Sequence, residues 1–283
     1  MERHFNYRND KATLYLISTP IGNLDDITFR AVKIMKEVPI LLAEDTRVSQ
    51  KLLHHFDIDK PLQSFHEHNE YQKADSVLTE LSKGNDVGLM SDAGMPLFSD
   101  PGSSLVQKAL AAGYNVVCLP GANAAVTGLL MSGINATPFY FAGFPERKAS
   151  KRRMQLESLK YRQETLVFYE APHRIESFLK DMLDIFGDRF GVILREISKA
   201  YEEVIRGKLS ELSTLADWKG ELVVVVAGTL PEKVDFSGSL VEQVDYFINE
   251  GYSKTSAMKK VTEMTGIPKN EIYREYLDKT KKQ

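Results

Sequence analysis

Cysteine is almost absent from this sequence, since Cys118 is the only one among 283 residues. A single thiol forms neither an intramolecular disulfide nor a thiolate metal cluster, so neither is expected. Its position in the apolar run Val-Val-Cys-Leu predicts a core thiol. No apolar run approaches the roughly 18 residues that cross a bilayer, and the first residues lack the apolar stretch of a secretory signal. We therefore expect a cytoplasmic protein with no membrane partner.

An excess of charge of one sign is also missing, because the formal net charge is only −3. Any nucleic-acid binding must then come from local patches. One patch has five positive charges in seven residues, on a predicted loop at the junction of two domains, where it could hold phosphates. Solvated surface is the alternative interpretation. Its basic residues are Arg147, Lys148, Lys151, Arg152 and Arg153. From Lys254 onward, eight basic and four acidic residues form a second candidate contact with an RNA backbone.

What the sequence does contain is a regular alternation of apolar runs and amphipathic stretches, which is typical of strand-helix repeats around a largely parallel sheet. Strands are predicted at 13–18, 39–44, 86–91 and 115–120, with helices near 26–37, 70–83 and 102–112. A second set of apolar runs lies at 139–144, 165–170, 190–196 and 221–228, with helices near 150–160 and 173–186. The fold class is therefore α/β, with two α/β domains at 12–137 and 138–230 after an N-terminal extension, 1–11.

The C-terminal part of the sequence has a different pattern. Residues 229–239 are rich in proline, glycine and serine and read as a linker. The tail, 239–283, contains no run typical of a strand and predicts three short helices, interrupted at Gly251 and at 266–268. We therefore expect a small appendage that resembles a helix-turn-helix.

Three loops follow predicted strands of the first domain, at 18–25, 91–102 and 120–125. Loops at the carboxyl ends of parallel strands meet at one edge of a sheet, where ligands bind in open α/β folds. Their small residues predict a floor that suits adenine, a ribose and a short amino-acid tail, and Asp92 could accept hydrogen bonds from ligand hydroxyls. The GxGxxG signature is missing, so a nicotinamide oxidoreductase is a poor alternative.

Six motifs in order along the chain carry a family resemblance: STPIGNLDDITFRA, AEDTR, SDAGMPLFSDPG, PGANAAVTGLLMSG, FYEAPHRI and REISKAYEEVIRG. Together they resemble the tetrapyrrole-methylase superfamily, and more narrowly its branch of small-subunit ribosomal RNA cytidine 2′-O-methyltransferases. The resemblance implies S-adenosylmethionine in a cleft between two α/β domains, and usually a homodimer. It implies that the substrate is a cytidine ribose in the decoding region of 16S rRNA, with the 30S subunit as the expected partner.

The resemblance also implies which residues contact the cofactor. They fall in the three loops, at the end of the 165–170 strand and after the 221–226 run. These residues are Pro20, Ile21, Gly22, Asp92, Gly94, Met95, Asn123, Ala124, Tyr169, Ala171, Ala227 and Gly228.

Methyl transfer to a ribose hydroxyl benefits from a base that takes the hydroxyl proton. Asp45 and Glu170 follow predicted strands and are the first candidates. Their charged neighbours Glu44, Arg47, His173 and Arg174 are predicted to face the RNA. An ion-pair network between the domains is the alternative for all of these charges. A further possible contribution comes from Glu196, Lys199, Glu202 and Glu203.

A metal centre is not expected, because His66 and His68 have no obvious third ligand. Two other functions remain open on these residues. One is carbon methylation of a tetrapyrrole precursor, and the other is a non-catalytic RNA-binding protein on the same fold. The basic patches weigh against the first, and retention of all three loops weighs against the second.

Overall fold

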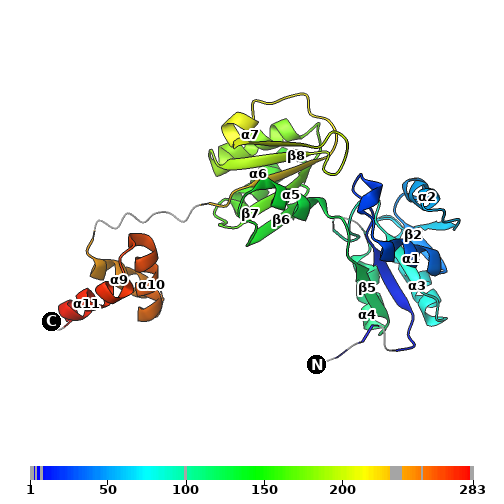
Figure 1. Ribbon diagram of the computed structural model, residues 1–283, viewed down its shortest axis with the longest axis horizontal. Coiled ribbons are helices and arrows are strands. Elements are labelled where there is room, and N and C mark those ends of the chain that lie inside the picture. The colour runs from blue at the N-terminus through cyan, green and yellow to red at the C-terminus, as the bar shows by residue number, and fades with distance from the viewer. Residues whose placement is uncertain are drawn as a thin grey trace. The chain divides into compact units, whose positions relative to one another are not determined.

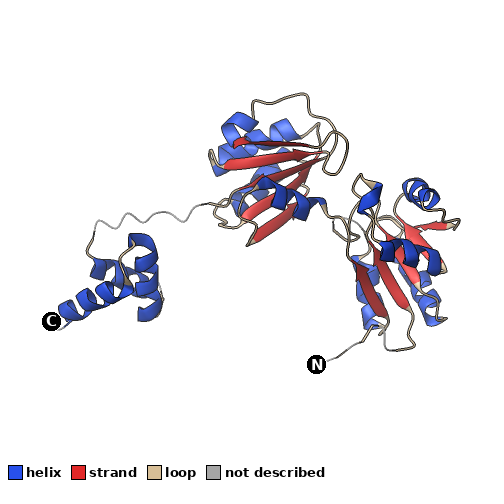
Figure 2. Ribbon diagram, in the orientation of Figure 1, coloured by secondary structure: helices blue, strands red, loops and turns tan. Residues whose placement is uncertain are grey.

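A computed structural model describes residues 3, 5–6, 9–98, 101–229, 238–249 and 251–280. The chain forms two compact units, residues 1–229 and 230–283. The first unit contains two five-stranded sheets, and the second contains helices (Figures 1 and 2). The predicted α/β class and the helical C-terminal part are therefore confirmed.

The first sheet is parallel, with strand order β3-β2-β4-β1-β5. Its strands are β1 (Thr13–Ile17), β2 (Ile40–Ala43), β3 (Leu62–Ser64), β4 (Val87–Met90) and β5 (Asn115–Leu119). Four of them were predicted. The three residues of β3 contain a single apolar side chain, so its sequence gives no strand signal.

Two helix pairs cover the two faces of this sheet. Leu14 and Leu16 of β1 pack with α3 (Glu70–Ser82) and α4 (Ser103–Ala111), whereas Ile17 packs with α1 (Phe29–Glu37) and α2 (Thr46–His55). Successive strand residues point to opposite faces, so apolar runs without alternation are expected in a sheet buried on both sides. A short 3-10 helix, η1 (Leu24–Asp26), precedes α1.

The prediction of a core thiol at Cys118 is wrong. Its strand β5 forms the edge of the sheet, and Val117 and Leu119 are the residues that face the core formed with α1 and α2. Cys118 points to the opposite face and is exposed. An apolar run at a sheet edge buries only part of its side chains, which the run itself does not reveal.

The second sheet is mixed and has the order β6-β7-β10-β8-β9. Its strands are β6 (Phe139–Gly143), β7 (Thr165–Glu170), β8 (Phe190–Arg195), β9 (Glu203–Lys208) and β10 (Leu222–Val226). Strands β6 and β7 are parallel, whereas β10 runs antiparallel to both of its neighbours. The edge strand β9 was not assigned from the sequence, because its charged residues suit an exposed helix equally well.

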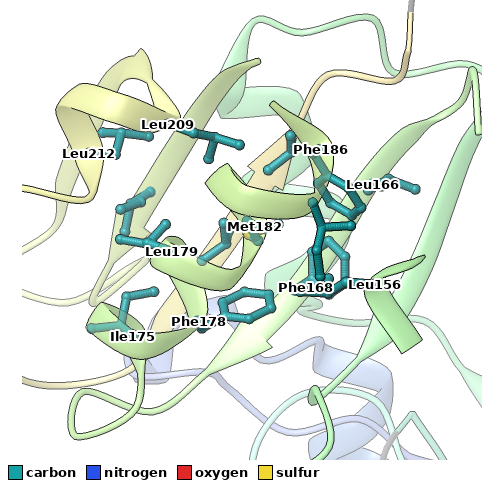
Figure 3. Close-up of a cluster of buried hydrophobic side chains, with 14 of the residues drawn as sticks. Leu156, Leu166, Phe168, Ile175, Phe178, Leu179, Met182, Phe186, Leu209 and Leu212 are labelled. Atoms are coloured by element: carbon teal, nitrogen blue, oxygen red, sulfur yellow. The ribbon is translucent and has the colours of Figure 1, made fainter. Parts of the chain in front are cut away.

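One face of the second sheet packs against α6 (Ala149–Leu159), α7 (Ile175–Phe186) and α8 (Leu209–Leu212). Figure 3 shows this core, in which Phe168 of the sheet lies beside Phe178 of α7, with the ring centroids 5.3 Å apart. The other face packs against α5 (Ala124–Ser132) through Ala125 and Leu129. Helix α5 belongs by sequence to the predicted first domain, so the boundary at residue 137 does not coincide with the division between the cores.

The second unit contains α9 (Leu240–Asn249), α10 (Lys254–Thr265) and α11 (Lys269–Thr280), as predicted. They share a core of their own, which includes Val244, Phe247, Met258, Val261 and Ile272. Most of the predicted linker, residues 230–237, lies outside the described residues. Among the described helices, none has the length and apolar character needed to cross a membrane.

Candidate functional site

A cavity of about 330 Å³ lies where loops of the first sheet meet loops of the second. The first sheet contributes the loops after β1, β4 and β5, and the second contributes the end of β7 and the beginning of β10. The lining residues are Ile21, Asp92, Ala93, Gly94, Met95, Phe98, Asn123, Ala124, Phe144, Tyr169, Glu170, Ala171, Pro172, Ile197, Gly220, Glu221, Leu222 and Val223.

Backbone pairing holds the first two loops together. Thr19 and Gly94 exchange two backbone hydrogen bonds, with N to O distances of 2.9 and 3.1 Å. Gly94 has a φ of 81°, and a Cβ there would lie 3.2 Å from Ile21 and 3.3 Å from the carbonyl of Ala122. Glycine is therefore needed both for the backbone conformation and for the close approach of the three loops.

Asp92 places a carboxylate in the wall of this cavity. Its Oδ1 accepts the backbone N–H of Asp45 at 3.0 Å, which ties the loop after β4 to the N-terminus of α2. Partial burial raises the pKa of Asp92, although the hydrogen bond from Asp45 opposes this change. A half-buried carboxylate with remaining acceptor capacity can bind ligand hydroxyls or a cation.

The third loop leads into the N-terminus of α5. Asn123 caps this helix, because its side chain accepts the N–H of Val126 at 2.9 Å. The hydroxyl of Tyr169 accepts the N–H of Ala125 at 3.0 Å. This bond fixes the ring of Tyr169, from the end of β7, against the loop that follows β5.

Glu170 is the most deeply buried ionisable group in the cavity wall, with 2% of its surface exposed. Its Oε1 accepts the N–H of Ala171 at 2.8 Å and lies 3.2 Å from Nε of Arg174. Its Oε2 has no hydrogen-bond partner among the described residues. Burial raises the pKa of Glu170, and the bond from Ala171 and the charge of Arg174 oppose this rise. The carboxylate is thus held in place and made more basic.

An ion-pair network forms the rim of the cavity at Gly220 and Glu221. Nζ of Lys199 lies 2.8 Å from carboxylate oxygens of both Glu196 and Glu221. The alkyl chain of Lys199 packs over Gly22, where a Cβ would lie 2.3 Å from Cγ of the lysine. These contacts join the loop after β1 to the loop after β8.

Eight of the twelve residues predicted to contact the cofactor line this cavity: Ile21, Asp92, Gly94, Met95, Asn123, Ala124, Tyr169 and Ala171. Two others lie beside it without lining it. Pro20 is buried behind the first loop, and Gly22 packs against Lys199.

Ala227 and Gly228 do not lie at this end of the sheet, and their prediction is corrected. Strand β10 is antiparallel to β7, so Leu222 pairs with Glu170 and Val226 pairs with Leu166. The start of β10 therefore reaches the cavity, and its end points away. Ala227 and Gly228 were expected from the family resemblance alone, and Gly220 to Val223, which do line the cavity, were not predicted. An apolar run carries no information on strand direction, so no sequence signal was available.

A second, more open hollow adjoins the cavity. Its lining residues are Phe144, Pro145, Glu146, Arg147, Ala171, His173 and Arg174. Phe144 and Ala171 line both spaces. Arg174 donates to the carbonyl of Pro145 at 2.5 Å while its Nε faces Glu170, so one guanidinium links the hollow to the buried carboxylate. We call this hollow the basic groove.

The basic patch at 147–153 is only partly available to a ligand. Residues from Ala149 onward form α6, which matches the helix predicted near 150–160, so this part of the patch is not the predicted loop. Arg152 is 5% exposed and pairs with Asp181 of α7 at 2.7 Å, so its prediction as a phosphate ligand is corrected. Arg153 pairs with Asp181 and Asp184. The remaining basic residues, Arg147, Lys148 and Lys151, are exposed.

The contacts of Asp45 do not support its predicted role as a base. It caps α2, and both carboxylate oxygens bind the guanidinium of Arg47 at 2.7 and 3.0 Å. These bonds lower the pKa of Asp45 to about 2, which makes it a weak proton acceptor. Neither Asp45 nor Glu44 lines the cavity. The side chain of Arg47 is 87% exposed.

The two histidines considered as metal ligands lie close to each other, with ring centroids of His66 and His68 5.9 Å apart. Within the described parts of the chain, no group of three or more histidine, cysteine, aspartate or glutamate side chains is arranged to hold a metal ion.

Comparison with known proteins places these features in a family. The family described as Tetrapyrrole (Corrin/Porphyrin) Methylases matches residues 13–213. The chain is 43% identical over 281 residues to "Ribosomal RNA small subunit methyltransferase I" of Bacillus subtilis, covering 96% of each chain. It is 41% identical over 277 residues to the protein of that name from Pseudomonas aeruginosa, covering 94% of this chain and 97% of the relative.

Two solved structures share the fold at low sequence identity. The uroporphyrin-III-C-methyltransferase from Thermus thermophilus aligns with a TM-score of 0.54 and 18% identity, over 76% of this chain and 94% of the other. A diphthine synthase aligns with a TM-score of 0.57 and 16% identity, over 78% and 92%.

Proposed function

We propose that this chain, which belongs to the tetrapyrrole methylase family and is an rRNA methyltransferase, methylates the 2′-oxygen of a cytidine ribose in the decoding region of 16S rRNA. The observation that carries the proposal is a buried carboxylate, Glu170, in the wall of a cavity that opens beside a basic groove. The names of the relatives favour RNA over a tetrapyrrole as substrate.

Methyltransferases of this family use S-adenosylmethionine, and the cavity fits such a ligand. About 330 Å³ is within the range of small-molecule sites, which combine apolar walls with a few polar groups. Ile21, Met95 and Leu222 supply apolar surface that would hold the adenine. Asp92 and the loop at Asn123 supply polar groups for the ribose and the amino-acid part.

Bound S-adenosylmethionine supplies an electrophilic methyl group on a sulfonium. This methyl group would be transferred to the ribose 2′-oxygen, and the sulfur would keep the electron pair of the carbon–sulfur bond. Glu170 accepts the hydroxyl proton. The bond from Ala171 holds its Oε1, and its raised pKa suits it to receive a proton from a neutral hydroxyl. The enclosing loops keep competing water out.

The basic groove is the proposed path of the RNA. Arg147, His173 and Arg174 line it, and phosphates bind guanidinium groups with well-defined geometry. Lys148 and Lys151 are exposed next to it and add positive charge. We propose 16S rRNA within the 30S subunit as the partner, and a homodimer remains a prediction.

Two measurements test the proposal. Titration calorimetry of the purified protein with S-adenosylmethionine should show binding, and its absence would exclude the assigned cofactor. Mapping of ribose methylation on 16S rRNA from cells with and without the protein should show one cytidine that loses its 2′-O-methyl group. Loss of a base methyl group, or no change at all, would contradict the assigned acceptor.

A further inference from the structure

Phe144 is a large apolar side chain exposed at the entrance to the site. More than half of its surface, 55%, is in contact with solvent, although the ring lines both the cavity and the basic groove. A single exposed apolar residue needs no explanation by itself. The position of Phe144 between the buried carboxylate of Glu170 and the basic groove, however, indicates a function.

The backbone presents this ring in a fixed way. The pairing of β6 with β7 shifts register between Phe141 and Gly143, and Gly143 has a φ of 68°. This irregularity turns the chain out of the sheet directly before Phe144. Pro145, which follows, is buried, and its carbonyl accepts a hydrogen bond from Arg174. The main chain is therefore held on both sides of Phe144.

Other aromatic side chains pack against the ring of Phe144 and against one another. It meets Tyr169 edge to face, with centroids 5.4 Å apart. Tyr169 meets Phe141 at 5.0 Å, and Phe141 stacks on Phe98 at 4.3 Å. Phe144 is thus the exposed end of an aromatic row that crosses the site, and a supported ring loses little conformational freedom when it binds a ligand.

Resting on the proposed function, we propose that Phe144 positions the acceptor nucleotide by stacking on its base. Proteins that read unpaired nucleotides stack the base on an aromatic ring while cations hold the neighbouring phosphates. Arg147, His173 and Arg174 line the basic groove together with this ring, and Glu170 lines the adjoining cavity. A base on Phe144 would leave its ribose near Glu170, whereas the cofactor occupies the cavity behind.

The test uses the full chain with Phe144→Leu, which keeps apolar volume but removes the ring, and Phe144→Trp, which keeps a ring. Tyr161→Leu is the matched control, because Tyr161 is 79% exposed and lines neither space. With unmethylated 30S subunits, Phe144→Leu should lower kcat/KM at least about tenfold. Phe144→Trp should recover most of this loss, Tyr161→Leu should match the wild type, and calorimetry should give similar S-adenosylmethionine affinities for all.

A spectroscopic measurement separates this proposal from the proposed function. The chain has one tryptophan, Trp218, so the fluorescence of Phe144→Trp minus that of the wild type reports on position 144. Stacking predicts that RNA quenches this signal, even if methylation were absent. Wild-type activity at Phe144→Leu, a parallel loss of cofactor affinity, failure of tryptophan to restore activity, or an unquenched signal would each overturn the stacking role. A wild type that methylates no ribose would instead overturn the proposed function.

Discussion

Glu170 and Asp45 both carry a carboxylate near the carboxyl end of a strand, but their environments have opposite effects on the pKa. Burial raises the pKa of Glu170, whereas two hydrogen bonds from one arginine lower that of Asp45 to about 2. A carboxylate that forms strong ion pairs has a lowered pKa and is therefore a weaker proton acceptor. These environments support the proposal that Glu170 is the base. Asp45 instead caps α2 and binds the guanidinium of Arg47.

Replacement of Glu170 by glutamine should lower kcat by about 10²- to 10⁴-fold, which is the usual contribution of a general base. The affinity for S-adenosylmethionine, measured by calorimetry, should remain similar. Asp45→Asn is the matched control, because asparagine still caps a helix. We expect it to retain turnover, and an equal loss in both variants would contradict this assignment.

The raised pKa of Glu170 also predicts how stability depends on pH. The folded state favours the protonated carboxyl relative to the unfolded chain, whose carboxyl titrates near the ordinary value of 4.5. Stability is therefore lost as the pH rises from the ordinary pKa through the raised one, and the loss is absent below the ordinary value. Relative to wild type, Glu170→Gln should become more stable as the pH rises from about 4 to about 8 in urea unfolding. A difference that is independent of pH would contradict the raised pKa.

At the scale of elements, the sequence predicted most strands and helices but not their directions. Apolar runs identify β7 and β10 as buried strands, and both were predicted. Whether β10 runs parallel to β7 depends on how the chain between them crosses the sheet, which no local pattern records. The residues expected here from the family resemblance, Ala227 and Gly228, therefore lie at the opposite end of β10 from Leu222 and Val223, which line the cavity. By contrast, the loops at Ile21, Asp92 and Asn123 follow parallel strands and were placed correctly at the cavity.

The burial of individual charged side chains could not be predicted from the sequence either. Five basic residues at 147–153 look alike in the sequence, yet Arg152 alone is buried, although Arg153 also pairs with α7. Asp181, the partner of Arg152, is 29 positions away. A helix period locates faces once the helix boundaries are known, but the patch was predicted as a loop even though it overlaps the helix predicted near 150–160.

The ion pair between Arg152 of α6 and Asp181 of α7 joins these two helices. Arg152→Ala removes the buried guanidinium that binds Asp181 and leaves this carboxylate only the half-exposed Arg153. Removal of one member of a buried ion pair costs about 3–5 kcal/mol of unfolding free energy, and because Arg153 remains we expect a loss near the lower end of this range. Lys151→Ala, on the exposed side of the same helix, should change stability by less than about 0.5 kcal/mol. Urea unfolding compares the two. RNA binding should show the opposite order, with a weaker salt dependence for Lys151→Ala only.

At the scale of the whole molecule, the cavity and the second compact unit are built from separate parts of the chain. All residues that line the cavity lie between positions 21 and 223, and α9, α10 and α11 bury their apolar side chains in a core of their own. A protein that ends at Thr229 should therefore fold and bind S-adenosylmethionine as the full chain does. Loss of cofactor binding on truncation, measured by calorimetry, would show that the site depends on the helical unit.

The helical unit should instead contribute to RNA affinity, because its exposed basic residues add positive charge that can bind phosphates. Lys269 and Arg274 of α11 are exposed and can be replaced by glutamine without disturbing the core around Ile272. Each phosphate contact that is lost should reduce the slope of log affinity against log salt by about 0.7 to 0.9. We therefore expect Lys269→Gln with Arg274→Gln, in the full chain, to bind 16S rRNA more weakly and with a shallower slope. Truncation at Thr229 should flatten the slope further, and an unchanged slope in both proteins would remove the helical unit from the RNA interface.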